Sequence, residues 1–288
     1  MKILLTGVNG QVGYELQRSL QPLGEVMALN RAQLDIGNFN QIRNVIRELK
    51  PDLVVNPAAY TAVDKAEVEP ELAMRINGVA PGVMAEECAR IGAALIHYST
   101  DYVFDGTKDG AYAEDDAVCP INVYGRTKAE GERAIQAAGC EFFIFRTSWV
   151  YGMYGNNFLK TVLRLARERD ELKIVSDQYG APTWSRTIAD TTSNVLAQLY
   201  GSKRSTMDRK GLSGIYHLSS QGSATWYDFA KAILANADAK KNRVLPIRTE
   251  EYPLPASRPK NSSLSCERLI STFCHLPEWE TALALCQK

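Results

Sequence analysis

A tyrosine and a lysine that lie four residues apart, Tyr124 and Lys128, have the spacing of a proton-transfer pair. On a helix, both side chains would lie on one face and could act together. A phenol has a pKa of about 10, and a neighbouring ammonium lowers that pKa by stabilising the phenolate. The pair therefore predicts that Tyr124 protonates a ketone oxygen while hydride reaches the ketone carbon. Thr100 is the candidate for a second hydrogen bond to that oxygen. An ordinary surface pair is the alternative interpretation.

A glycine-rich turn lies near the beginning of the chain, in the run Thr6-Gly7-Val8-Asn9-Gly10-Gln11-Val12-Gly13. The apolar residues before it predict a buried strand, and the periodicity after it predicts a helix. Between the two, Gly7 permits a tight turn, Gly10 lets the backbone approach a pyrophosphate, and Gly13 allows close packing of helix on strand. The GxxGxxG spacing thus predicts a dinucleotide site, with an ordinary glycine turn as the alternative.

The residues after the second predicted strand bear on which dinucleotide binds. Asn30 stands where an NAD enzyme with this arrangement places an acidic side chain, and Arg31 could pair with a ribose phosphate. We therefore expect NADPH, with NADH possible, although Arg31 would also fit a solvated loop. Asp35 and Ile36 follow as candidates to contact the adenine, or Asp35 begins the next helix.

Two further runs follow predicted strands. Residues 57–64 are mostly small and would let a flat cofactor lie against the backbone, with a tight turn as the alternative. The candidate cofactor contacts in this run are Ala58, Ala59, Tyr60 and Thr61. Residues 97–104 place several hydroxyl groups at the end of the fourth predicted strand, where Thr100 lies.

The alternation of strands and helices predicts an α/β protein with a Rossmann-like doubly wound parallel sheet. The predicted strands are residues 2–6, 26–29, 53–56, 94–98 and 142–146, and the predicted helices include 11–20, 39–50 and 82–91. Ligands of such sheets bind at the carboxyl ends of the strands. Residues 1–150 are expected to form an NAD(P)-binding domain that carries the Tyr/Lys pair. Residues 151–288 are expected to form mainly a smaller C-terminal substrate-binding lobe, with some segments returning to the sheet. The polar segment 201–214 predicts a surface loop.

The composition is that of a soluble enzyme, with 288 residues, 45% hydrophobic, and 33 basic against 33 acidic side chains. This balance gives no general electrostatic reason to expect nucleic acid or an anionic membrane as a partner. The absence of a long apolar run and of a signal-peptide pattern predicts a cytoplasmic location.

Cysteine and histidine spacing predicts no metal or redox site. The six cysteines contain no CxxC motif, and His97, His217 and His275 are far apart. We expect reduced thiols and packed or hydrogen-bonded histidine rings. Glu15 alone is too little to define a metal site, so no metal ligand is predicted and a role for Mg²⁺ stays open.

Over nearly its whole length the chain resembles the extended short-chain dehydrogenase/reductases, and within them the dTDP-4-dehydrorhamnose reductases. The resemblance is carried by residues 56–64, His97-Tyr98-Ser99-Thr100-Asp101-Tyr102-Val103-Phe104, and residues 124–128, 145–151, 177–183 and 258–262. It implies reduction of the 4-keto group of dTDP-4-dehydro-β-L-rhamnose to dTDP-β-L-rhamnose by NADPH or NADH, the last step of that sugar-nucleotide pathway.

The resemblance also implies roles for individual residues. Thr100, Tyr124 and Lys128 match the family's catalytic positions. The family's cofactor contacts are matched by Gly10, Gln11, Val12, Asn30, Asp35, Ile36, Ala59, Tyr60, Thr61 and Tyr98. Its sugar contacts are matched by Thr100, Asp101, Tyr102, Tyr124, Lys128 and Trp149, to which we add Thr61 and Val63 as candidates. Asn30 replaces an acidic residue of some members, which argues against strict use of NADH.

Two residues beyond the Tyr/Lys pair are candidate substrate contacts with ordinary structural alternatives. Trp149 follows the fifth predicted strand, where its ring could pack on a deoxysugar methyl group, or it could belong to the core. Arg258 could meet a diphosphate through charge-assisted hydrogen bonds, or it could be an exposed arginine. Residues 177–183 are expected to form one wall of the substrate cleft.

Other functions on the same fold have to be weighed. A nucleotide-sugar dehydratase would place an Asp-Glu pair after the threonine, whereas here Asp101 is followed by Tyr102. A 4-epimerase would keep the tyrosine motif, and a non-catalytic regulatory subunit would keep the fold. The chain is expected to be a monomer or a homodimer.

Overall fold

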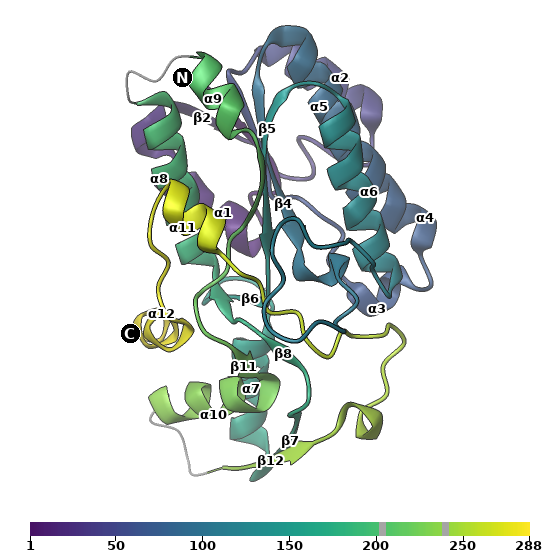
Figure 1. Cartoon of the computed structure of the whole chain (residues 1–288), viewed down its shortest axis with the longest axis vertical. Coiled ribbons are helices and arrows are strands. Elements are labelled where there is room, and N and C mark those ends of the chain that lie inside the picture. Colours follow the sequence, from purple (N-terminus) through teal and green to yellow (C-terminus); the bar gives the residue numbers. More distant parts are fainter. Residues whose placement is uncertain (202–205, 238–241) are drawn as a thin grey trace.

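The computed structural model describes residues 1–201, 206–237 and 242–288, with only the backbone for 206–208. Its centre is a six-stranded parallel sheet in the order β2-β1-β3-β4-β5-β10 (Figure 1). The strands are β1 (Lys2–Leu5), β2 (Glu25–Ala28), β3 (Leu53–Asn56), β4 (Ala94–Thr100), β5 (Glu141–Thr147) and β10 (Gly214–His217). The predicted α/β fold with a doubly wound parallel sheet is confirmed.

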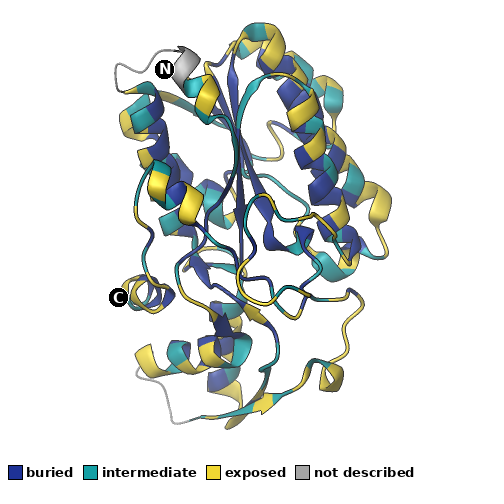
Figure 2. Cartoon of the chain, viewed as in Figure 1, coloured by how far each residue is buried: buried dark blue, intermediate teal, exposed yellow. Residues whose placement is uncertain are grey.

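The middle strands of the sheet are buried along their whole length. β3 buries all 4 of its residues and β4 all 7, as expected for parallel strands that are covered by helices on both faces (Figure 2). β4 and β5 continue beyond the predicted ends, and their last residues, Thr100 and Thr147, are paired in register. The apolar pattern stops earlier because the buried residues Ser99 and Thr100 are polar. β10, on the outer side of β5, was not predicted.

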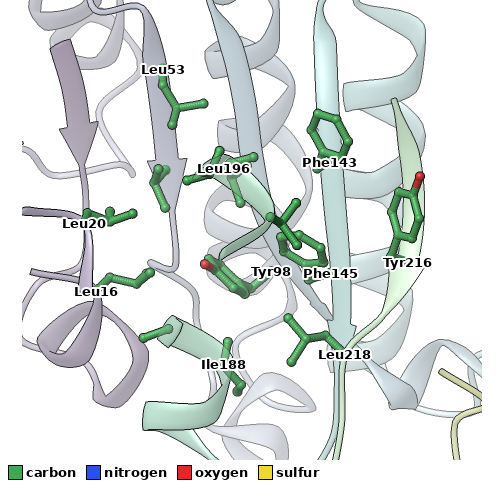
Figure 3. Packing of buried hydrophobic residues seen from close by; sticks show 14 of the residues in the cluster. Leu16, Leu20, Leu53, Tyr98, Phe143, Phe145, Ile188, Leu196, Tyr216 and Leu218 are labelled. Carbon is green, nitrogen blue, oxygen red and sulfur yellow. The ribbon is translucent and has the colours of Figure 1, made fainter. Parts of the chain in front are cut away.

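Helices cover the two faces of the sheet (Figure 1). One face carries α1 (Gln11–Ser19) and α8 (Ser185–Tyr200), and the other carries α2 (Phe39–Leu49), α5 (Ala80–Ile91) and α6 (Val123–Ala137). On the first face, Leu16 of α1 and Leu20, the residue that follows α1, share a core with Ile188 and Leu196 of α8 (Figure 3). Each such side chain contributes roughly 1.5–3 kcal/mol on full burial. This shared core draws residues 185–200 back onto the sheet.

A second, smaller layer of structure lies beyond the carboxyl ends of the strands, at the bottom of Figure 1. Its elements are β6 (Val150–Tyr151), α7 (Phe158–Glu168), β7 (Glu171–Val175), β8 (Tyr179–Gly180), β9 (Thr183–Trp184), β11 (Ala224–Thr225), α10 (Trp226–Asn236), β12 (Arg243–Ile247) and α12 (Trp279–Cys286). They share their own core, which includes Tyr151, Leu159, Phe229 and Leu283. The chain therefore leaves the sheet after β5, returns in α8 and β10, and leaves again.

The short elements join these layers. They are η1 (Gln21–Leu23), α3 (Val63–Ala66), α4 (Pro70–Ala73), the π-helix η2 (Met74–Val79), η3 (Asp101–Val103), α9 (Thr206–Leu212), η4 (Thr249–Glu251) and α11 (Glu267–Thr272). The prediction of a loop over residues 201–214 is wrong for residues 206–212, which are helical, and residues 202–205 lie outside the described residues.

The first prediction concerns the close contact between α1 and the glycine-rich turn. A Cβ on Gly13 would lie 2.2 Å from the backbone oxygen of Gly7, which cannot yield without opening the turn. Gly13→Ala should lower the free energy of unfolding by about 1–3 kcal/mol, measured by urea denaturation. Gly211→Ala is the matched control, because a Cβ on Gly211 of α9 would meet nothing within 4 Å. Equal urea midpoints for the two variants would contradict this account.

Candidate active site

The start of α6 sets the position of Tyr124 and Lys128. Asn122 caps the helix by accepting a hydrogen bond from the Gly125 backbone N–H at 2.7 Å. A Cβ on Gly125 would lie 2.1 Å from the backbone oxygen of Tyr102, so the first turn of α6 packs directly on η3 at the end of β4. The predicted helical spacing of the pair is present, and it is held against the strand that carries Thr100.

Lys128 is a buried ionisable side chain at the junction of α6 and β4. Its side chain is only 1% exposed, and Nζ donates to the backbone oxygen of Tyr98 at 2.5 Å and lies 3.0 Å from Nε2 of His97. Burial lowers the pKa of Lys128 to about 8, while the negative charge of Glu132 opposes this shift. Two of the three hydrogen-bonding positions of Nζ are therefore occupied within the protein.

Thr100 and Tyr124 lie beside a buried carboxyl group. Thr100 Oγ1 donates to Oδ1 of Asp101 at 2.9 Å and accepts from the Tyr102 backbone N–H at 3.2 Å. Burial raises the pKa of Tyr124 to about 12, a hydrogen bond with Thr100 lowers it, and the Asp101 carboxylate raises it. Tyr124 is thus a neutral phenol in this form of the protein, which is the form of a general acid.

Asp101 is 2% exposed, and within the described part of the chain its Oδ2 makes no hydrogen bond. Burial raises its pKa to about 6, and hydrogen bonds with Ser262 and Thr100 oppose the rise. Next to it, the rings of Tyr102 and Tyr124 meet edge to face with centroids 6.1 Å apart. The structure therefore brings together the predicted group of Thr100, Asp101, Tyr102 and Tyr124.

Asn77 in η2 is a residue of this region that sequence reasoning missed. Its Oδ1 accepts from the backbone N–H of Tyr60 at 2.8 Å, and its Nδ2 donates to the Tyr60 carbonyl oxygen at 3.0 Å. Nδ2 also donates to Thr127 Oγ1 at 3.2 Å. Asn77 therefore fixes the run 57–61 to α6 one residue before Lys128. The signal that could have drawn attention to it is the π-helical turn, which often marks a functional site but is visible only in the structure.

The glycine-rich turn faces the run 57–61 across the end of the sheet. Gly7 has φ +58°, and a Cβ there would lie 2.8 Å from the backbone of Ala58. The amino end of α1 has no side-chain cap and no acidic residue in its first turn. Its N–H groups are thus open to an anionic ligand, as a dinucleotide pyrophosphate requires. Gln11 lies at this end, with its Oε1 2.8 Å from Asn157 Nδ2, and Val12 packs on the core of the sheet.

The residues after β2 keep the polar loop that the sequence predicted. Asn30 Oδ1 accepts from the Ala32 backbone N–H at 2.9 Å, and the Arg31 side chain is 79% exposed with only a distant Asp35 carboxylate at 3.9 Å. Asp35 Oδ1 accepts from the Gly37 N–H at 3.0 Å, and Ile36 is buried. The alternative role of Asp35 as the cap of the next helix is wrong, because Asn38 caps α2.

Other predicted contacts differ in how accessible they are. Tyr98 points into the opposite core and its hydroxyl meets Thr192 Oγ1 at 2.8 Å, so only its backbone oxygen faces Lys128. The side chain of Tyr60 donates to Glu69 at 2.6 Å, which raises its pKa to about 12. Thr61 is exposed and Val63 begins α3.

Trp149 lies two residues beyond the paired ends of β4 and β5, in a strained conformation. Its φ of +45° is left-handed, which costs a non-glycine residue of order 1–3 kcal/mol. The ring stacks on Trp226 with centroids 3.6 Å apart, and Gly180 packs against its other atoms so closely that a Cβ would lie 2.6 Å away. Residue 180 of the predicted wall 177–183 therefore contacts Trp149. The partner Trp226 was not predicted from the sequence.

Arg258 is held by an ion pair rather than left free. Its Nη1 and Nη2 lie 2.6 and 2.7 Å from the two carboxylate oxygens of Asp64 in α3. The Arg258 hydrogen bond holds the pKa of Asp64 below its usual value. Asp64 lies in the first turn of α3. A diphosphate contact by Arg258 stays a prediction, and any such ligand would share the guanidinium with Asp64.

No group of three or more His, Cys, Asp or Glu side chains among the described residues is arranged to hold a metal ion. Glu15 lies 3.8 Å from Arg186. None of the described helices is both long enough and apolar enough to cross a membrane.

Comparison with known proteins was made on the whole chain. Residues 1–288 match the family model described as the RmlD substrate binding domain. The dTDP-4-dehydrorhamnose reductase of Burkholderia thailandensis is 49% identical over 294 residues, which cover 99% of this chain and 98% of that protein. The chain belongs to the dTDP-4-dehydrorhamnose reductase family.

Solved structures of the dTDP-4-dehydrorhamnose reductase family have the same fold. The protein from Clostridium acetobutylicum is 40% identical with a TM-score of 0.91, covering 99% of this chain and 98% of that one. The protein from Bacillus anthracis, solved in complex with NADP, is 39% identical with a TM-score of 0.91, covering 99% of both chains. The resemblance drawn from the motifs is confirmed. The family that it names consists of enzymes that use a nicotinamide cofactor.

The second prediction tests the Asp64–Arg258 pair as the attachment of residues 256–258 to this family's catalytic region. A double-mutant cycle of Asp64→Asn and Arg258→Gln should give a coupling of about 1 kcal/mol or more in urea unfolding at pH 7. Because the folded pKa of Asp64 is depressed, the coupling is present above the unfolded value of about 4 and disappears as the pH falls through the folded value.

The exposed pair Arg186–Asp190, with side chains 47% and 52% exposed, is the control for this cycle. Its coupling should be only a few tenths of a kcal/mol, as for other pairs one helical turn apart. A coupling at Asp64–Arg258 that is no larger than this, or that does not weaken as the pH falls below the unfolded pKa of about 4, would contradict the assignment.

Proposed function

We propose that the chain reduces the 4-keto group of dTDP-4-dehydro-β-L-rhamnose to give dTDP-β-L-rhamnose, using NADPH. The observation that carries this proposal is the meeting of Thr100, Tyr124 and Lys128 at the carboxyl edge of the sheet, beside an uncapped helix amino end. In a chain that belongs to this family over its whole length, these groups supply the proton-transfer half of a carbonyl reduction.

The glycine-rich turn fits the cofactor. The N–H groups at the start of α1 are open to the expected pyrophosphate, and Gly7 approaches the backbone of Ala58 closely. Residues 57–61, fixed by Asn77, would bound the nicotinamide half. When bound, the reduced nicotinamide supplies the hydride that the reaction requires.

Tyr124 is the proton donor to the ketone oxygen. The rise of its pKa to about 12 without ligand keeps the phenol protonated before reduction. As the phenolate forms, the Lys128 ammonium stabilises it through the charge it brings to the site. Because the pKa of Lys128 is lowered to about 8, this help is lost as the pH rises above that value. Reduction is therefore expected to slow on the alkaline side.

Thr100 can assist only after its hydrogen bonding changes. Its single hydroxyl proton is donated to Asp101 Oδ1, so it cannot at the same time be donated to a substrate oxygen. Either the proton turns from Asp101 to the substrate, or Asp101 is protonated and donates to Thr100. The pKa of Asp101, raised to about 6, brings the second arrangement within reach near neutral pH.

The preference for NADPH rests on the loop after β2. Asn30 brings no negative charge, and Arg31 is 79% exposed and only loosely paired, so its guanidinium is free to turn to a ribose 2′-phosphate. NADH is a weaker second substrate on this proposal. A role for Mg²⁺ stays open. The monomeric or homodimeric state, the boundary near residue 150 and the cytoplasmic location stay predictions.

The third prediction tests the reaction and its proton donor. Purified chain is mixed with NADPH and enzymatically generated dTDP-4-dehydro-β-L-rhamnose, and NADPH oxidation and the product sugar are measured. Tyr124→Phe should lower kcat at least about a hundredfold, because the phenol proton is gone. Tyr227→Phe on α10, away from the sheet edge, is the control and should retain the native rate.

Three other outcomes would redirect the assignment. If the native chain binds NADPH but leaves the keto sugar unreduced, the substrate is wrong. Interconversion of 4-epimers without net oxidation of the cofactor would establish an epimerase. Cofactor binding without turnover, together with co-purification of another enzyme, would favour a regulatory subunit.

The fourth prediction tests cofactor choice. Arg31→Ala should raise KM for NADPH about tenfold and leave KM for NADH nearly unchanged, since only NADPH carries the 2′-phosphate. Arg133→Ala is the control, because Arg133 has a comparable exposed fraction of 64% on the outer surface of α6. Equal changes of KM for the two cofactors in Arg31→Ala would overturn the role given to Arg31.

A further inference from the structure

Four buried polar side chains form a continuous chain from the glycine-rich turn to Lys128. Thr6 Oγ1 donates to Asn56 Oδ1 at 2.6 Å, Asn56 Nδ2 lies 3.1 Å from His97 Nδ1, and His97 Nε2 lies 3.0 Å from Lys128 Nζ. Each of the four residues is at most 1% exposed. Thr6 follows β1, Asn56 ends β3, His97 lies in the middle of β4, and Lys128 belongs to α6, so this series of hydrogen bonds crosses the centre of the fold.

The direction of each hydrogen bond among these four side chains follows once the proton of the His97 ring is placed. Burial and the neighbouring Lys128 lower the pKa of His97 well below its usual value, so the ring is neutral and carries one proton. In a neutral imidazole one nitrogen donates and the other accepts. Asn56 Nδ2 can only donate, so in the arrangement observed Nδ1 accepts and the ring proton is on Nε2.

This places a requirement on Lys128. A proton on Nε2 points at Nζ, and an ammonium has no lone pair with which to accept it. The arrangement observed is therefore complete only if Nζ is an uncharged amine, which accepts from Nε2 and donates to the Tyr98 oxygen. An ammonium requires the reverse: a bare Nε2, the proton on Nδ1, and the oxygen of Asn56 turned toward the ring.

We propose that His97 is a positioning residue whose tautomer changes together with the charge on Lys128. With the amine, the ring carries its proton on Nε2. With the ammonium, the ring carries it on Nδ1, and the carboxamide of Asn56 turns over so that its NH₂ group donates to Thr6 Oγ1. One proton is taken up in total: Nζ gains it, and the ring loses a proton at Nε2 as it binds one at Nδ1.

The charged groups around Lys128 are themselves paired, so His97 is the group that responds when the charge on Lys128 changes. Glu132, one turn beyond Lys128 on α6, is the charged group whose field acts on Nζ, and it is itself paired with Arg146 of β5 at 2.7 Å. The Tyr98 carbonyl accepts from either form of Nζ. On the other side of the ring lie only the neutral side chains of Asn56 and Thr6 in this chain of hydrogen bonds. When the charge on Nζ changes, the neutral groups of His97 and Asn56 therefore rearrange their hydrogen bonds.

The consequence for the reaction rests on the function proposed above, in which the ammonium stabilises the Tyr124 phenolate. His97 allows Nζ of buried Lys128 to keep a hydrogen-bond partner on the ring in both charge states, and an unpaired group there would cost roughly 1–3 kcal/mol. Through Asn56 and Thr6 the same rearrangement reaches the residue next to Gly7. The charge on Lys128 and the glycine-rich turn are thereby linked through side chains alone.

The direct test is ¹⁵N NMR of the histidine ring nitrogens in the full chain without substrate, from pH 6.5 to 10. The sequence has 3 histidines, which makes assignment by single substitution simple. We expect the two nitrogens of His97 to exchange protonated and unprotonated shifts with one midpoint near the pKa of Lys128, about 8. In Lys128→Met this pH dependence should disappear. His217, which is buried against Arg146 and does not contact Lys128, should not change in either protein.

Two results would overturn the proposal. One is a His97 tautomer that is the same from pH 6.5 to 10 in the native chain. The other is a tautomer change that persists in Lys128→Met. Neither depends on turnover, so failure of the proposed reaction, seen as an unreduced keto sugar, is distinguished from failure of this inference.

A kinetic test uses two substitutions of the same residue. The side chain of His97→Gln can offer an oxygen or an NH₂ group to Nζ, so the alkaline limb of kcat/KM should stay where it is. His97→Leu offers neither and increases desolvation, which should move the limb by about one pH unit toward lower pH. His217→Leu is the control for loss of a buried ring and should leave the limb unchanged. Identical limbs for His97→Leu and the native chain would contradict a positioning role.

Discussion

The burial of Lys128 between α6 and β4 is the constraint on which the arrangement of the site depends. An amine or ammonium in the interior must have hydrogen-bond partners, because leaving one unmade costs more than a typical core contact contributes. The partners come from the backbone of Tyr98 and the ring of His97, which β4 presents to the α6 side. β3 in turn supplies Asn56 to the ring, and β1 supplies Thr6 to Asn56. The parallel register of three strands therefore determines the surroundings of one lysine. A shift of β4 by one residue would carry the His97 ring to the other face of the sheet, away from Nζ.

A second set of contacts fixes the segments that the sheet does not reach. The first turn of α6 lies on the backbone of Tyr102, the Asn122 side chain donates to the Ser257 oxygen at 2.8 Å, and Asp64 binds Arg258. These contacts bring residues from near 60, 100, 125 and 258 to one place. Asn77 does the same for the run 57–61. The expected cofactor region and the proton-transfer residues are therefore parts of one hydrogen-bonded structure, and a change at one is transmitted to the other through few atoms.

The fold could be predicted where the chain repeats a simple pattern. β1, β3, β4 and β5 contain short apolar runs, which is the pattern of a strand that is buried on both faces. Beyond residue 150 the prediction weakens for a physical reason. α8 packs against α1, and β10 pairs with β5, through contacts between segments that lie far apart in the sequence. The strands β6, β8, β9 and β11 have 2 residues each, which is too short to show a periodic pattern. The helix α9 was missed because a polar segment carries no sign of which face is buried.

By itself the sequence determined the fold class, the glycine-rich turn, and the pairing of Tyr124 with Lys128, because each depends on spacing along one element or one turn. Only the tertiary structure decided what surrounds them. Asn77, Asp64 and Trp226 become neighbours of the candidate residues through packing between elements that lie far apart in the chain. The tertiary structure likewise decided three other features, because each depends on the distance and orientation of groups: the hydrogen bond from Thr100 to Asp101, the strained backbone of Trp149, and the contact of His97 with Lys128. A sequence specifies the kinds of groups that are present, whereas the direction of a hydrogen bond is set only when both partners have been placed.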